Sequence, residues 1–307
     1  MHLARLELTN FKNYEEVSLE FSPGFNCFVG NNGVGKTNIL DAIHYLSLTK
    51  SFFNSSDTLA IRHGEDYFMI KGTFVTEENS DELFCAFQKA KQKVFKINGK
   101  EYQRMSDHVG KFPVVMLSPA DSTLITGGSE ERRRFLNMII SQYDPAYLEA
   151  HMRYNKALMQ RNRILRGSVA DTSGLLEIYD DQMAQEAEVI YRSRRSLTEN
   201  MLPLFRSYYE KISGGAEKVA IRYRSHLSSG DYLQQLAVSR ERDFALQYTT
   251  AGIHRDDLVF EIEGHSARTN ASQGQQKSFI VALKLAKFGL ISRIIGFAPA
   301  LLLDDIF

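Results

Sequence analysis

The chain has 307 residues, and its 37 Lys and Arg residues balance its 37 Asp and Glu residues, so its formal net charge is zero. This length allows a large core and favours either one domain with an insertion or two domains. A balanced charge excludes a wholly basic nucleic-acid-binding protein but leaves room for a local basic face. Two cysteines, Cys27 and Cys85, and an N-terminus without an apolar signal core predict a reducing, cytoplasmic setting. The longest apolar stretch, residues 294–303, is too short for a membrane span.

The first 125 residues are rich in predicted strands. Residues 17–21 alternate between apolar and polar side chains, as in a strand with one buried face. Asn98-Gly99 favours a type I′ hairpin that pairs residues 94–97 with the segment at Tyr102. The other expected strands are residues 67–75, 83–88 and 112–117. The strands at 67–75, 83–88 and 94–97 predict an antiparallel β layer, and residues 112–117 predict a separate buried strand.

A glycine-rich run at residues 30–37 carries the clearest functional signal. It fits the phosphate-binding pattern G-x-x-x-x-G-K-[ST] at every fixed position. It follows residues 25–29, which are typical of a buried strand, and precedes an amphipathic helix. The loop's N–H groups would converge on phosphate oxygens, Lys36 would contact the β- and γ-phosphates and serve in catalysis, and Thr37 would bind Mg²⁺. The expected nucleotide-binding residues are Gly30, Asn31, Asn32, Gly33, Val34, Gly35, Lys36, Thr37 and Asn38.

Beyond residue 125 the pattern changes to long helical segments, which cover residues 130–209 apart from a connection at 167–174. Strands are expected again at residues 219–224 and 258–262, and a helix at 278–291. The sequence therefore predicts an α/β fold in which both ends of the chain form a nucleotide-binding lobe around an inserted, mostly helical lobe. The expected bounds are 1–125 for the first part of the nucleotide-binding lobe, 126–250 for the helical lobe and 251–307 for the return.

An apolar strand that ends in two carboxylates lies at residues 299–305. This is the form of a Walker B element, in which Asp304 would hold Mg²⁺ and Asp305 would orient or deprotonate the attacking water. The alternative is an ordinary buried strand followed by acidic turn residues.

A small-residue turn at residues 271–278 opens a predicted helix. It resembles the signature motif of ABC-type ATPases, with Gln273 in place of the first glycine. A serine hydroxyl, a close-approach glycine and a helix N-terminus all favour a phosphate, here through Ser272, Gln273, Gly274 and Gln275. The resemblance implies that this motif faces the nucleotide of a second subunit, so that ATP joins two heads. The alternative is that Ser272 is only a helix N-cap.

Nine short segments together resemble the RecF family of DNA replication and repair proteins, which belongs with the SMC and Rad50 group of ABC-type ATPases. They are residues 8–14, 30–41, 50–52, 117–121, 132–136, 160–165, 252–258, 272–278 and 301–307. The resemblance implies an ABC-type P-loop ATPase head that binds ATP and Mg²⁺, with weak DNA-stimulated ATPase activity and ATP-induced homodimerisation. It also implies sequence-independent binding of duplex DNA near single-strand gaps, and work with RecO and RecR to load RecA during repair of DNA damage, replication and the SOS response.

Three departures from the family pattern stand out. Phe53 and Asn54 follow the Ser-Phe pair where the family usually has Arg. Lys12 stands where Arg is commoner, which keeps the charge but loses the planar fork. The chain stops at Phe307, where the family continues, so we expect a truncated chain.

The helical region is rich in arginine, with nearby carboxylates that almost cancel it. Its cations could bind DNA phosphates, but they could equally lie on solvated helix faces or pair with carboxylates. We expect a structural role for His254 and core positions for Tyr208, Tyr209 and residues 244–248. The cations considered are Arg132, Arg133, Arg134, Arg153, Lys156, Arg161, Arg163, Arg166, Arg192, Arg194 and Arg195.

Two other functions remain open at this point. The first is an SMC- or Rad50-type head that tethers DNA, although the insertion lacks sustained heptads and a Cys-x-x-Cys hook. The second is the energising subunit of a transporter, which would need a membrane partner.

Overall fold

The computed structural model describes residues 1–77, 79–167, 174–215 and 217–305. The chain forms two compact units, one made of Met1–Pro119 and Ile291–Phe307 and the other of Ala120–Leu290. Both ends of the chain therefore contribute to the first unit. The boundaries differ from the expected ones, because residues 120–125 and 251–290 belong to the second unit instead of the first.

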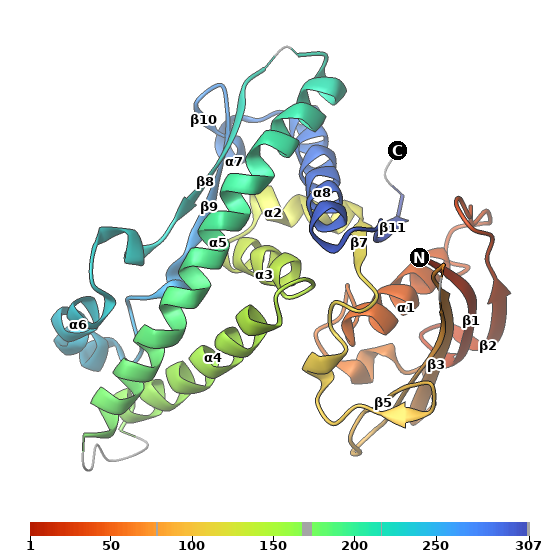
Figure 1. Cartoon of the computed structure of the whole chain (residues 1–307), viewed down its shortest axis with the longest axis horizontal. Helices are drawn as coiled ribbons and strands as arrows, with labels where there is room; N and C mark the ends of the chain where they lie inside the picture. Colours follow the sequence, from red (N-terminus) through yellow and green to blue (C-terminus); the bar gives the residue numbers. More distant parts are fainter. Residues whose placement is uncertain (78, 168–173, 216, 306–307) are drawn as a thin grey trace. The chain divides into compact units, whose positions relative to one another are not determined.

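Unit 1 contains a six-stranded antiparallel sheet in the order β2-β1-β3-β4-β5-β6 (Figure 1). The hairpin expected at Asn98-Gly99 is confirmed, since both residues have positive φ angles of 49° and 77° and Lys96 pairs with Glu101. The strands are β1 (His2–Phe11), β2 (Tyr14–Glu20), β3 (Tyr67–Val75), β4 (Ser80–Gln88), β5 (Val94–Ile97) and β6 (Lys100–Glu101).

Helix α1 (Lys36–Leu48) fills the core of unit 1, where all ten residues from Ile39 to Leu48 are buried. Tyr45 meets Phe11 and Phe68 edge-on, which ties the helix to β1 and β3. The hydroxyl of Ser47 donates to the carbonyl of Phe112, just before β7 (Val114–Leu117). Strand β7 pairs in parallel with β11 (Ala300–Leu303). The helix thus connects the antiparallel sheet to the parallel pair.

The buried strand expected at residues 25–29 is wrong. These residues form no strand, and Phe25 and Val29 are almost fully exposed. The reason is that an apolar segment becomes a strand only when a neighbour accepts its N–H and C=O groups. In the described part of the chain the parallel sheet consists of β7 and β11 alone, and neither pairs with this segment.

Unit 2 combines helices with a small antiparallel sheet in the order β10-β9-β8. The expected helices and strands of this region form, and α5 continues through Pro203. The longer elements are α3 (Ser129–Ile140), α4 (Pro145–Leu165), α5 (Leu175–Ser213), α6 (Tyr232–Leu246) and α8 (Gln273–Ile295), with β8 (Val219–Arg224) and β9 (Asp257–Ile262). The last turn of α8, from residue 291, belongs to unit 1. The shorter elements of unit 2 are α2 (Thr123–Thr126), β10 (His265–Ser266) and α7 (Ala267–Asn270).

Short 3-10 helices occur in both units. They are Asp57–Ala60, Met105–Asp107, Pro119–Ser122, His226–Ser229 and Ile253–Arg255.

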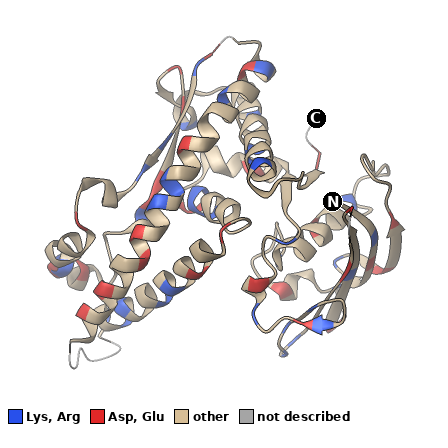
Figure 2. Ribbon diagram, viewed as in Figure 1, with Lys and Arg blue, Asp and Glu red and all other residues tan. Residues whose placement is uncertain are grey.

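Helix α5 runs along α4 and β8 and forms the centre of unit 2 (Figure 1). One face of α5 buries apolar residues such as Met183, Ile190 and Phe205, at spacings that repeat with the helical period. Figure 2 shows both signs of charge along α4 and α5. No helix among the described residues has the length and apolar character needed to cross a membrane.

Candidate nucleotide site

The glycine-rich loop ends where α1 begins, and Gly35 makes the transition possible. Gly35 has φ of 108°, a left-handed value that disfavours any side chain. A Cβ atom there would also lie within 2.8 Å of the side chains of Asn13 and Tyr14. Asn13 holds the loop in place by donating to the carbonyl of Val34 at 3.1 Å and accepting from the amide of Asn38 at 2.7 Å. The loop therefore needs glycine at position 35 because of both its backbone and its neighbours.

Lys36 closes the loop from the helix side. Its Nζ donates to the carbonyl oxygens of Gly30 at 2.7 Å and Asn31 at 2.9 Å. The ammonium group therefore lies at the loop, where the partial positive charge of the α1 N-terminus adds to its own. This arrangement suits an anion.

Thr37 and Asp304, the two expected Mg²⁺ ligands, are in direct contact although 267 positions separate them in the sequence. The Thr37 hydroxyl donates to Oδ1 of Asp304 at 2.7 Å, and the Ser118 hydroxyl donates to Oδ2 at 3.4 Å. The parallel register, with Leu303 opposite Leu117, places Asp304 and Ser118 just beyond the ends of β11 and β7. A hydroxyl and a single carboxylate are hard oxygen ligands, which fit Mg²⁺ completed by phosphate oxygens and water. Among the described residues no cluster of three or more His, Cys, Asp or Glu side chains could hold a metal by itself.

Asp305 follows Asp304 but differs from it in its surroundings. Asp304 is buried, whereas Asp305 is exposed and has φ of 44°. The chain therefore turns sharply at the strand end, which separates one carboxylate inside the site from one at its surface.

Lys12 and Phe53, which both depart from the family pattern, are in contact in the structure. The Lys12 ammonium pairs with the fully buried Asp41 at 2.6 Å and lies 5.2 Å from the centre of the Phe53 ring. Asp41 also accepts from the Ser51 hydroxyl at 2.7 Å and from the Phe52 N–H at 2.6 Å. Lys12 thus anchors α1 to the turn at residues 51–53, with Phe53 as a cation–π partner.

The signature segment lies in unit 2, at the start of α8. The Ser272 hydroxyl accepts from the N–H of Gln275 at 3.2 Å, while the Gln275 side-chain oxygen accepts from the N–H of Ser272 at 2.7 Å. This reciprocal pair is a capping box. The N-cap role considered for Ser272 is therefore real, and it leaves Gln273 and Gly274 exposed at the helix start.

Many arginines of unit 2 pair with carboxylates. Arg194 donates to Asp256 at 2.6 Å, and Arg132 contacts both oxygens of Asp257, at 2.6 and 3.1 Å. Burial raises the pKa of Asp256, and the positive charge of Arg194 works against that rise. The exposed Arg153, Arg192 and Arg195 each pair with a glutamate. The segments at 132–136 and 252–258 are thus parts of one buried charge network.

His254 has the structural role expected from its sequence context. Its Nε2 lies 3.0 Å from the carbonyl of Thr249 and its Nδ1 lies 2.8 Å from the hydroxyl of Tyr154. Burial lowers the pKa of His254 to about 4, so the ring is neutral at pH 7. A neutral ring can donate from Nε2 to the carbonyl and accept at Nδ1 from the hydroxyl.

Residues that sequence patterns did not single out complete the nucleotide site. Asn13 supports the loop and Ser118 contacts Asp304, and each lies in a segment matched by family resemblance without an assigned role. The only sequence signal for these two residues was that each lies close to an expected strand, and no pattern indicated which atoms they would contact.

The aromatic residues expected in the core of unit 2 differ in their burial. Tyr209 is buried as expected, but Phe244 and Tyr248 are exposed, so the expected core position of residues 244–248 is wrong.

A family model described as the RecF/RecN/SMC N terminal domain matches residues 2–307. A solved structure of the recombination mediator protein RecF-ATP in the RecFOR pathway aligns with a TM-score of 0.92 and 30% identity, over 99% of this chain and 84% of that chain. A Smc head domain from Pyrococcus furiosus aligns with a TM-score of 0.52 at 17% identity, which is a likeness of fold alone. Fold and site together define an ABC-type P-loop ATPase head.

Relatives in sequence narrow this class. A DNA replication and repair protein RecF of Parabacteroides distasonis is 46% identical over 307 residues, covering 100% of this chain and 84% of that protein. The RecF of Bacteroides thetaiotaomicron is 46% identical over 308 residues, with the same coverage. The chain belongs to the RecF family.

Proposed function

We propose that this chain is an ATP-dependent DNA-binding protein of recombinational repair and replication. The observation that carries the proposal is the 2.7 Å contact between Thr37 and Asp304, which joins the phosphate loop to the acidic strand end. The loop, the helix N-terminus and Lys36 supply cationic and N–H groups for phosphates, and Thr37 with Asp304 supplies oxygen ligands for Mg²⁺. RecF bound to ATP shares the fold over 99% of this chain.

ATP acts in this proposal mainly as a dimerisation ligand. The signature segment at Ser272 to Gln275 opens α8, so its helix N-terminus and the exposed Gly274 can approach the phosphates bound by a second subunit. Asp305, exposed beside Asp304, orients the attacking water, and slow hydrolysis then releases the dimer. The difference in ATP affinity between monomer and dimer sets how strongly ATP drives association.

The dimer binds duplex DNA near single-strand gaps without reading its sequence, and it assists RecA loading together with RecO and RecR in the cytoplasm. Support for this part comes from membership of the RecF family, whose named relatives are DNA replication and repair proteins. Backbone recognition also fits a chain with no Trp and with arginine as a frequent cation.

Lys36→Ala should weaken ATP binding by about 10- to 100-fold, because it removes charge-assisted hydrogen bonds to phosphate. Isothermal titration with ATP and Mg²⁺ measures this directly. Lys91→Ala is the matched control, since it removes an exposed lysine from a turn in the same unit. Equal affinity of the Lys36→Ala variant and the unaltered chain would contradict the phosphate role of Lys36.

Sedimentation with ATP and Mg²⁺ tests the dimer, and binding to gapped and blunt duplexes tests the DNA part. We expect an ATP-dependent dimer that Lys36→Ala prevents, and tighter binding to the gapped duplex. A chain that stays monomeric at every ATP concentration would remove the dimer mechanism, and equal DNA binding without ATP would leave only nonspecific electrostatic attraction.

A further inference from the structure

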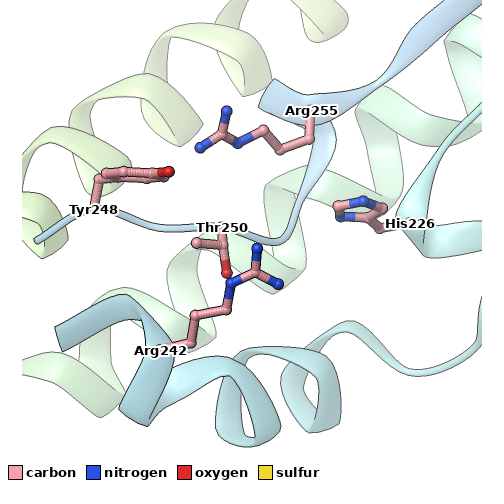
Figure 3. A pocket seen from close by; sticks show the side chains of 5 residues that line it. All are labelled: His226, Arg242, Tyr248, Thr250 and Arg255. Carbon is pink, nitrogen blue, oxygen red and sulfur yellow. The ribbon is translucent and has the colours of Figure 1, made fainter. Parts of the chain in front are cut away.

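A cationic pocket in unit 2 has no place in the nucleotide chemistry described above. It has a volume of about 340 Å³ and is lined by five side chains, none of them acidic (Figure 3). They come from the turn before α6, from α6 itself and from the 248–255 segment that precedes β9. The lining residues are His226, Arg242, Tyr248, Thr250 and Arg255.

A buried polar network holds the wall of this pocket. Asp243, which is fully buried, accepts from the N–H of Thr250 at 2.9 Å and from its hydroxyl at 2.7 Å. Arg161, also fully buried, donates to Asp243 at 2.7 Å and to the Thr249 hydroxyl at 2.8 Å. Asn162 accepts from the N–H of Thr249 at 2.8 Å. Residues 161–162 of α4 and Asp243 of α6 therefore hold the backbone at residues 249–250 in this wall.

Gly252 fixes the next turn of that wall. Its φ is 133°, and a Cβ atom there would lie 2.1 Å from the hydroxyl of Tyr232 and 2.5 Å from that of Tyr154. Its N–H donates to Nδ1 of His226 at 3.2 Å. This hydrogen bond connects His226, another lining residue, to the turn at Gly252. With its backbone held at Thr249, Thr250 and Gly252, the segment presents Thr250 and Arg255 in defined positions.

The two pocket arginines have no carboxylate partner among the described residues, unlike the paired Arg132, Arg161 and Arg194. Within the described residues Arg242 makes no hydrogen bond or ion pair, and Arg255 has only a 3.5 Å contact with the carbonyl of Thr249 and a 4.9 Å approach to the Tyr248 ring. Asp243, which follows Arg242 on α6, is already bonded to Arg161 and Thr250. Figure 3 shows the Arg242 and Arg255 side chains on the same pocket. Two guanidinium groups therefore share a space whose lining side chains carry no compensating negative charge.

We propose that this pocket binds a phosphate group of the DNA backbone, with Arg242 and Arg255 as its main ligands. A guanidinium group donates two parallel hydrogen bonds to a phosphate. Both arginines are exposed, so a backbone phosphate can reach them without opening the fold. A polyanion that makes further contacts elsewhere binds to such an exposed site with much higher affinity than a single free anion does. The proposal rests on the DNA binding proposed above.

The decisive variant is Arg242→Gln with Arg255→Gln. We expect its affinity for a duplex of about 30 base pairs, measured by fluorescence anisotropy with ATP and Mg²⁺, to fall at least tenfold. The slope of the logarithm of the binding constant against the logarithm of salt concentration should shrink by about one for each DNA phosphate that is no longer neutralised. Arg242→Lys with Arg255→Lys keeps the charge and should recover most of the salt slope but only part of the affinity.

Arg192→Gln with Arg195→Gln is the matched control. It also removes two exposed arginines from unit 2, but each is paired with a glutamate one helical turn away. This variant should change the affinity less than threefold and leave the salt slope intact. ATP affinity and the thermal unfolding curve should stay unchanged in every variant, because the P-loop lies in unit 1.

Three outcomes would overturn the inference. The Gln variant could bind DNA with unchanged affinity and slope, or no more weakly than the control variant. Inorganic phosphate alone could stabilise the unaltered chain through these arginines while DNA binding does not depend on them, which would assign the pocket to a small anion. If the unaltered chain binds no DNA at all, the proposed function fails together with this phosphate site, and that result is distinct from the first two.

Discussion

Arg161→Met should lower the free energy of unfolding of unit 2 by about 3–5 kcal/mol, one of the two largest effects that we expect in this chain. Arg161 is fully buried and holds two carboxylates, Asp180 at 2.5 Å and Asp243 at 2.7 Å. Removing the cation leaves both acids buried with too few partners, and that penalty exceeds what the pairs themselves contribute. Urea unfolding followed by far-ultraviolet circular dichroism measures the change.

Arg195→Met is the control for this experiment. Its ion pair with Glu199 is exposed on both sides, and exposed pairs of this spacing contribute less than about 0.5 kcal/mol. A destabilisation of the Arg161→Met variant no larger than that of this control would contradict the buried network.

A second substitution tests whether the unpaired carboxylates cause the loss of stability in the Arg161→Met variant. Asp180→Leu added to Arg161→Met should restore part of the stability, because it removes one of the two unpaired acids. Arg240, the other partner of Asp180, is partly exposed and can turn to water. Strictly additive effects would mean that the two side chains act independently.

The arrangement of the candidate nucleotide site was predictable from sequence because its residues lie in short contiguous runs. Lys36 and Thr37 follow a fixed spacing from the loop glycines, and Asp304 follows directly after an apolar run. A glycine-rich loop that leads directly into a helix N-terminus places its N–H groups in a predictable position. A carboxylate that follows a parallel strand lies at the carboxyl edge of the sheet. The 2.7 Å contact between Thr37 and Asp304 follows from these two local facts once β7 and β11 pair.

Pairing between distant residues was not predictable in the same way. Residues 25–29 have a strand-like composition, but composition cannot supply a neighbouring strand. The partners of Arg132, Arg161 and Arg194 lie up to 125 positions away, and each arginine had several carboxylates to choose from. The one available hint was the near balance of charge in unit 2, which suggested pairing without naming partners.

The cationic pocket was also not predictable from sequence. Its residues extend from His226 to Arg255, and no motif includes them all. Tyr248 belongs to an apolar cluster that suggested core packing, yet it is 38% exposed and faces Arg255. Only the fold shows which arginines have carboxylate partners and which do not.

Lys287→Met should stabilise unit 2 by about 2–4 kcal/mol at pH 7, the largest gain that we expect from one substitution. Lys287 is 1% exposed, and its hydrogen-bonding contact is the Met138 sulfur at 3.8 Å, a weak acceptor. Burial lowers its pKa to about 7, and the positive charge of Lys284 adds to this effect. An unfolded lysine titrates near 10.4, and a difference of about three units corresponds to about 4 kcal/mol. Methionine has a similar length and no charge to bury, so it removes most of this cost.

The pH dependence identifies the cause. The pKa of Lys287 is lower in the folded chain, so the unfolded chain binds more protons between pH 7 and about 10.4, and the cost of the lysine shrinks as pH rises through that range. The gain from Lys287→Met should therefore be full at about pH 6 to 7 and clearly smaller at about pH 9, in urea unfolding of both proteins. Lys277→Met, an exposed change on the same helix, should have little effect at any pH. Lys284→Met should instead destabilise, because it removes the 2.6 Å partner of the buried Asp121. A gain from Lys287→Met that did not vary with pH would show that packing, and not a buried charge, limits stability at this position.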